Sequence, residues 1–174
     1  MKKFYILILM STILSAQLLI TPIESMNMTF GDKLEVTKKN ILLSKKEAKR
    51  VQNIAKVKLN SKIFRIFTAK KDSNIIGYGI LVNQKVRSKN AVIMYHIGYN
   101  GILKGIEVIS FNEPLEYLPS KTWSSQFKDR ETDKMLRVSK EIPTITGATL
   151  SARAITDASR VAFAIYTEIL KKKQ

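Results

Sequence analysis

Four predominantly apolar stretches of the chain have the residue types that favour β-strands. They are residues 63–68, 75–82, 91–97 and 102–111, and they are rich in isoleucine, valine, phenylalanine and tyrosine. Polar segments separate the first three. Asn100-Gly101 lies between the last two, where both residues tolerate the positive φ of a tight hairpin. This pattern predicts four consecutive strands joined as an antiparallel meander.

Helical spacing of apolar residues marks three further segments. Ser44 and Glu47 have the spacing of a capping box, and apolar residues then repeat at helical spacing to about Val57. A short helix is expected over residues 120–127, after a proline-bounded loop, and a long one over residues 150–170, which contain no proline or glycine. The expected fold class is α+β: a twisted antiparallel sheet packed against helices, with a long C-terminal helix.

The beginning of the chain has the order of an export signal. Lys2 and Lys3 precede an apolar run over residues 4–20, which predicts a signal peptide or an N-terminal membrane anchor over residues 1–25. Cleavage at Ala16 or near Ser25 and retention as an anchor stay open, and a buried core helix is the alternative to both. The protein is expected to be exported, either periplasmic or on the outer face of the cytoplasmic membrane.

The remaining chain is interpreted as a linker and one domain. Residues 26–43 are mixed and weakly patterned, which is typical of a solvated connection, and residues 44–174 are enough for a single core. His96, the only histidine, falls on a predicted strand. It is expected either on the solvent face or in one core hydrogen bond, and it is given no functional role.

Composition excludes several kinds of chemistry. The sequence has no cysteine and one histidine, which rules out disulfides, thiolate nucleophiles, cysteine-bound clusters and metal sites with several histidines. The formal net charge of +16 predicts acidic partners, which are nucleic acid, anionic lipid or acidic redox proteins. Export argues against nucleic acid, so no nucleic-acid partner is expected.

A turn of small and hydroxyl residues precedes the long helix. Gly147 and Ala148 allow a ligand to approach the backbone, Thr146 and Ser151 offer hydroxyls, and the free N–H groups of a helix start favour an anion. Thr149 lies within reach of a phosphate bound there. The alternative is an ordinary helix cap made by Thr146 or Thr149.

The turn resembles a family motif. Thr146-Gly147-Ala148-Thr149 is similar to the Ser/Thr-Gly-Ala-Thr flavinylation motif of the FMN-binding domain family, in which a flavin transferase joins the FMN phosphate to the last threonine. Residues 96–106, 113–117 and 123–127 also resemble the family, so the likeness spans roughly residues 75–168. It implies an FMN cofactor, attached through a phosphoester to Thr149.

The resemblance also implies which residues form the site. FMN is expected where the loop after Phe111 meets the start of the last helix, and the cofactor-binding set is Thr146, Gly147, Ala148, Thr149, Ser151, Glu113 and Trp123. Trp123, Phe127 and Tyr117 suit either stacking on the flavin ring or core packing. Glu113 and Glu116 suit turn capping better than acid–base catalysis. Arg153 suits a phosphate, or simply an exposed helix position.

One position departs from the family pattern. The family usually has aspartate three residues before the Ser/Thr of the motif, and this chain has Pro143 there. Glu141 then supplies a nearby carboxylate in an altered register, or FMN binds without the covalent bond.

By resemblance, the expected function is electron carriage by an extracytoplasmic flavoprotein rather than catalysis. Similar domains occur in sodium-pumping quinone reductases, in their ferredoxin-linked relatives and in small stand-alone carriers. The expected partners are a flavin transferase, an acidic redox protein or a membrane electron-transfer complex, and the membrane through the N-terminal segment. An exported basic binding module without cofactor is the first alternative. A flavin reductase ranks lower, because no glycine-rich dinucleotide fingerprint is present.

Overall fold

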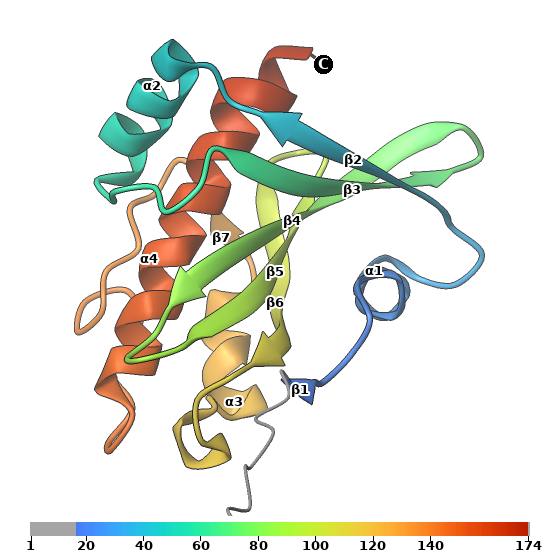
Figure 1. The fold of residues 1–174 in the computed structure, drawn as a ribbon. Coiled ribbons are helices and arrows are strands. Elements are labelled where there is room, and N and C mark those ends of the chain that lie inside the picture. Colours follow the sequence, from blue (N-terminus) through green and yellow to red (C-terminus); the bar gives the residue numbers. More distant parts are fainter. Residues whose placement is uncertain (1–16, 174) are drawn as a thin grey trace, which may run out of the picture.

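The four predicted strands form the centre of an antiparallel sheet. The computed structural model describes residues 17–173, and its central strands follow one another as an antiparallel meander (Figure 1). They are β3 (Ile63–Lys71), β4 (Asn74–Lys85), β5 (Asn90–Gly98) and β6 (Ile102–Phe111). The prediction of four consecutive strands is therefore confirmed.

The segment interpreted as a linker is part of the sheet, so that interpretation is wrong. Strand β2 (Glu35–Leu42) pairs with β3 along its whole length and forms one edge of the sheet. Most of its side chains are exposed, because an edge strand packs on few neighbours. Its sequence therefore lacks the apolar alternation that reveals a half-buried strand. Two short strands, β1 (Gln17–Leu18) and β7 (Arg130–Glu131), pair with β6 at the opposite side.

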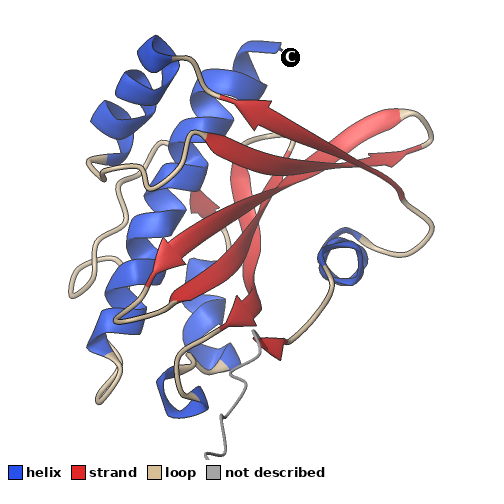
Figure 2. Ribbon diagram, viewed as in Figure 1, coloured by secondary structure: helices blue, strands red, loops and turns tan. Residues whose placement is uncertain are grey.

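Two helices cover one face of the sheet and build the main core. They are α2 (Lys45–Ala55) and α4 (Thr149–Ile165), and α4 continues through further helical turns to Lys173 (Figures 1 and 2). The predicted capping box is present: the Ser44 hydroxyl accepts from the N–H of Glu47, and the Glu47 carboxylate accepts from that of Ser44. The buried Tyr95 hydroxyl of β5 donates to the Ile155 carbonyl at 2.6 Å, which ties α4 to the sheet.

The short predicted helix follows β6 and the loop after it. Helix α3 (Lys121–Ser124) runs into a 3₁₀ turn (Ser125–Phe127), and another 3₁₀ turn (Leu115–Tyr117) precedes it. The fold class is therefore α+β, with a long C-terminal helix as predicted.

A helix that the sequence did not predict covers the opposite face of the sheet. Helix α1 (Pro22–Phe30) lies against this face (Figure 1), and its Met26 inserts into a second core that contains Met94 and Ile109. Ser25 of this helix is buried, and its hydroxyl lies 2.9 Å from Nε2 of His96. His96 therefore makes a core hydrogen bond, which is one of the two placements that the sequence predicted for it. The folded domain therefore reaches back at least to β1.

The predicted leader overlaps this folded segment. Residues 1–16, which hold most of the apolar run, lie outside the described residues, whereas residues 17–25 form β1 and the start of α1. The boundary predicted at residue 25 thus falls inside a helix that packs on the sheet. Within residues 17–173, no helix is long and apolar enough to cross a membrane.

Two glycines of β4 let α1 approach the sheet closely, which leads to a stability prediction. A Cβ at Gly77 would lie 2.3 Å from the Phe30 ring and 2.9 Å from the Ile97 carbonyl oxygen. We expect Gly77→Ala to lower the free energy of unfolding by about 1–3 kcal/mol, because the ring has to move off the strand. Denaturant unfolding measures the change. Gly105→Ala on β6 is the matched control, since a Cβ there meets nothing within 4 Å, and equal losses in both variants would contradict the explanation.

Candidate functional site

Helix α4 begins without a side-chain cap, at the small-residue turn that was predicted to hold a phosphate. The capping residue is Ala148, whereas hydroxyl side chains cap α1, α2 and α3. Neither Thr146 nor Thr149 makes a cap hydrogen bond, so the alternative of an ordinary threonine cap does not describe this structure. The first backbone N–H groups of α4 are therefore left for a ligand or for water.

The turn before the helix presents Thr149 to solvent. Gly147 has a φ of +78°, which favours glycine, and the N–H of Ala148 donates to the Ile145 carbonyl at 3.0 Å to close the turn. The Thr149 side chain is exposed, and within residues 17–173 its hydroxyl makes one hydrogen bond, a long one of 3.4 Å to the same carbonyl. Its hydroxyl is therefore accessible to a reacting phosphate.

A cavity of about 290 Å³ opens beside this helix start, and we call it the flavin cavity. One wall is the turn itself, which includes four of the predicted site residues. The other wall comes from the loop after β6 and from the turn between β4 and β5. The lining residues are Val86, Arg87, Glu113, Tyr117, Gly147, Ala148, Thr149, Leu150 and Ser151. The structure thus brings Glu113 to the small-residue turn before α4, although 34 positions separate Glu113 from Gly147.

Glu113 holds the wall of the cavity in place. Its Oε1 accepts from the backbone N–H groups of Ser88 at 2.6 Å, Lys89 at 2.7 Å and Arg87 at 3.1 Å. Burial opposes ionisation of this carboxyl, but these N–H groups and the Ser88 hydroxyl outweigh it and hold its pKa below the ordinary value. Glu113 is therefore an ionised anchor for the β4–β5 turn, which is the turn-capping role that its sequence position favoured.

Removing that charge should loosen the turn. We expect Glu113→Gln to lower the free energy of unfolding by about 1–3 kcal/mol, because an amide accepts three N–H bonds less well than a carboxylate does. Denaturant unfolding at neutral pH measures the loss. Glu116→Gln is the matched control, since Glu116 is exposed in the same loop. A Glu113→Gln variant as stable as the control would show that the anchor is dispensable.

Trp123 and Thr146 do not line the flavin cavity. The Trp123 side chain is buried against Phe127, with ring centroids 5.2 Å apart, and its Nε1–H donates to the Pro143 carbonyl at 2.8 Å. Trp123 therefore fixes the chain six residues before Thr149. Thr146 is exposed on the turn. A direct contact of either residue with FMN stays a prediction.

Glu141, the suggested substitute for the family's aspartate, is engaged elsewhere. Its carboxylate accepts from the side chain of Arg137 at 2.9 and 3.3 Å, and this pairing is the main cause that lowers its pKa to about 2. It does not line the flavin cavity. At position 143 itself, the chain offers a proline carbonyl that Trp123 already binds.

Comparisons with known proteins show the family to which the chain belongs. The sequence profile of the FMN-binding domain matches residues 23–164. This chain belongs to the FMN-binding domain family. A curated relative in Acetobacterium woodii, which is one of the subunits of the Na(+)-translocating ferredoxin:NAD(+) oxidoreductase complex, is 25% identical over 138 residues. The match covers 71% of this chain and 67% of the relative.

FMN is the cofactor that this family membership indicates, and the residues present suit it. The uncapped helix start offers N–H donors to a phosphate, and Tyr117 and Leu150 offer flat and apolar surface to a ring. The cavity volume is just below the range of about 300–1,000 Å³ that is usual for ligand pockets. A bound FMN would therefore keep part of its surface in solvent.

Sequence reasoning missed the far wall of the cavity. Val86 and Arg87 lie in a turn more than 20 positions before Glu113, and the Glu113 hydrogen bonds bring that turn to the site. Arg87 also packs on the Tyr117 ring, with its guanidinium carbon 5.8 Å from the ring centre. A glutamate that is buried after a strand needs hydrogen-bond donors. The sequence does not show which backbone N–H groups supply them.

Proposed function

We propose that this protein is an extracytoplasmic electron carrier whose FMN is attached through a phosphoester to Thr149. The observation that carries the proposal is the position of the Thr149 hydroxyl, which is exposed at an uncapped helix start and borders the flavin cavity. Family membership identifies the cofactor. The resemblance of Thr146 to Thr149 to the flavinylation motif supports Thr149 as the attachment point.

Attachment requires an activated flavin, because an alcohol and a phosphate monoester do not condense in water without one. The Thr149 oxygen forms the new bond to the FMN phosphorus of a flavin dinucleotide, and the phosphoanhydride bond to the nucleotide breaks. The threonine proton passes to a base of the transferase, and a nucleoside monophosphate leaves. No oxidation or reduction occurs in this step, so the flavin enters and stays in its own redox state.

Once bound, the flavin supplies the redox chemistry, since it accepts one or two electrons and releases them. The protein's own residues fix its place and leave it accessible. A small cavity, exposed at Leu150 and Arg87, suits a cofactor that must exchange electrons with a partner rather than enclose a substrate. This arrangement supports carriage rather than turnover.

Charge and the N-terminal segment support the proposed location and partners. The net charge of +16 favours an acidic redox protein or a membrane electron-transfer complex over a basic partner. The apolar run over residues 4–20 supports export and membrane association. The relative in Acetobacterium woodii belongs to a complex, which favours the same kind of assembly here. A covalent bond would also retain the cofactor outside the cytoplasm.

The test is the mass of the denatured full-length protein, produced with an exported flavin transferase and digested into peptides. We expect the mass of FMN less one water on the peptide that contains Thr149. Intact protein that releases all of its FMN on denaturation would replace the covalent proposal with simple binding. Protein that holds no flavin in either form would overturn the proposed function.

A further inference from the structure

Thr149 borders a second hollow that shares no other residue with the flavin cavity. This cleft has a volume of about 250 Å³, and three arginines contribute to its lining, so we call it the arginine cleft. The lining residues are Arg137, Val138, Ser139, Thr144, Thr149, Arg153, Asp157 and Arg160. The hydroxyl proposed to carry FMN therefore stands between two hollows of different chemistry.

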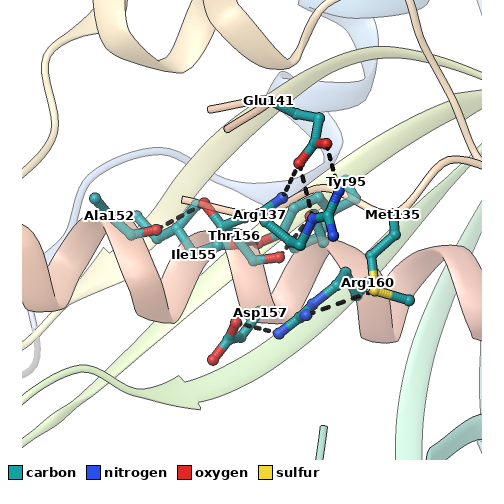
Figure 3. A network of polar contacts seen from close by, with 10 residues as sticks. Tyr95, Met135, Arg137, Glu141, Ala152, Ile155, Thr156, Asp157 and Arg160 are labelled. Carbon is teal, nitrogen blue, oxygen red and sulfur yellow. Dashed lines mark hydrogen bonds and ion pairs between the residues drawn. The ribbon is translucent and has the colours of Figure 1, made fainter. Parts of the chain in front are cut away.

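The arginine cleft has more positive than negative charge. Asp157 pairs with Arg160, and Glu141 pairs with Arg137 from outside the lining (Figure 3). Arg153 has no ion pair within the described part of the chain, and the buried Nε of Arg160 has no hydrogen-bond partner there. The excess of guanidinium groups, with Arg153 left unpaired among the described residues, suits an anion that brings acceptor oxygens.

The charges that line the flavin cavity, by comparison, are balanced. Its one guanidinium, that of Arg87, packs on the Tyr117 ring, its one carboxylate is the ionised Glu113, and the rest of its lining is apolar, small or hydroxyl-bearing. A phosphate placed there would lie near a carboxylate. The cavity therefore suits the uncharged part of FMN better than the phosphate.

The spacing of Arg153 along α4 also suits a phosphate on Thr149. Residues four apart on a helix are neighbours, and an anion on the N-terminal side of a cation is the favourable order. Arg153 follows Thr149 by four positions, and both line the arginine cleft. Because Pro143 replaces the usual aspartate of the family, no carboxylate at that position competes with the phosphate.

We propose that the phosphate of the attached FMN lies at the start of α4 on the side of the arginine cleft, where Arg153 holds it, while the ring occupies the flavin cavity. This inference rests on the proposed attachment to Thr149. Arg153 is then a positioning residue: it neutralises the phosphate and sets the direction in which the rest of FMN leaves the threonine. Arg137 and Arg160 add positive charge on the same side.

The experiment compares arginines from the two hollows in the full chain. Arg153→Ala, Arg153→Lys and Arg87→Ala are each loaded by the flavin transferase, and attachment is followed by intact mass. We expect Arg153→Ala to slow the initial rate about tenfold, as for the loss of one hydrogen bond to a charged group. Arg153→Lys should recover part of the rate, because it keeps the charge but not the fork.

Phosphorus NMR of the fully loaded proteins gives a second readout that a change in folding alone would not produce. Arg153→Ala should move the phosphodiester signal toward that of a free FMN alkyl ester, and Arg87→Ala should leave it in place. A signal moved by Arg87→Ala alone, or by neither variant, overturns the inference while the attachment itself stands. A wild-type protein without covalent flavin would instead refute the proposed function.

Discussion

Thr149→Ala is expected to abolish covalent flavin completely, because the side chain loses the only oxygen that the proposed attachment uses. The variant should still fold, since Thr149 is exposed and its hydroxyl makes one long hydrogen bond, of 3.4 Å to the Ile145 carbonyl, in the part of the chain that the structure describes. Alanine is also a better helix former than threonine. The measurement is in-gel flavin fluorescence after denaturation, together with the intact mass.

Two neighbouring changes serve as controls for this result. Thr149→Ser keeps the hydroxyl, so it should retain the flavin. Thr146→Ala removes the other exposed threonine hydroxyl of the motif, three positions earlier, and should also retain it. Flavin that persists on Thr149→Ala and disappears from Thr146→Ala would move the attachment to Thr146. Loss of flavin from all three variants would indicate that the turn, rather than one hydroxyl, had been damaged.

The central sheet was predictable because its strands carry their own signals. Strands β3 to β6 are runs rich in β-branched and aromatic residues, since cores on both faces of the sheet bury most of their side chains, and the Asn100-Gly101 turn marks the hairpin between the last two. The capping box likewise located α2. In these elements, local preference and tertiary packing favour the same structure.

The N-terminal elements were harder to predict, for two different reasons. Strand β2 is an edge strand with mostly exposed side chains, so burial imposed no alternation on it. Helix α1 does carry local signals, with Thr21 as its cap, a proline at its first position and Gly31 just beyond its end. Those signals lie directly after an apolar run that resembles a leader. The predicted leader, residues 1–25, includes the start of α1, so no helix was predicted there.

The candidate site also has one part that could be predicted from the sequence and one part that could not. The residues of the small-residue turn before α4 are consecutive in sequence, so they could be predicted together from the motif of Thr146 to Thr149. The far wall depends on Glu113 reaching a turn that is distant in sequence, and the arginine cleft depends on Arg137 lying near the start of α4. Such contacts are set by the packing of the whole domain, which residue spacing alone does not specify.

His96 should make the protein lose stability as the pH falls, and this is the second large effect. Burial is the main cause that lowers the pKa of His96 from 6.5 to about 4, and the backbone of Gly105 offsets it in part. The unfolded chain therefore binds a proton between these two values and the folded chain does not. Linkage then lowers the free energy of unfolding as the pH falls from 6.5 to about 4, by roughly 3 kcal/mol in total. Above this window both states are neutral at His96, and below it both are protonated.

His96→Gln isolates this effect from that of the carboxylates. Burial raises the pKa of Glu107, so this group opposes the loss on acidification, whereas Glu168 has a lowered pKa and adds to it. Both groups are present in the wild type and in the variant, so the difference between the two stability curves reports His96. We expect the difference to change across the window and to be flat above it. Parallel curves throughout would contradict the assignment.

The position of His96 also predicts which part of the fold loosens first on acidification. His96 lies 2.9 Å from the Ser25 hydroxyl, at the contact between α1 and the sheet, so the cost of protonation falls on that contact. We expect hydrogen exchange at residues 22–30 to accelerate on acidification before exchange in α4 does. Because the chain has one histidine, its imidazole NMR signals can be followed without ambiguity. A titration near the ordinary pKa of 6.5 would show that α1 leaves His96 open to water, and the acid sensitivity would then need another source.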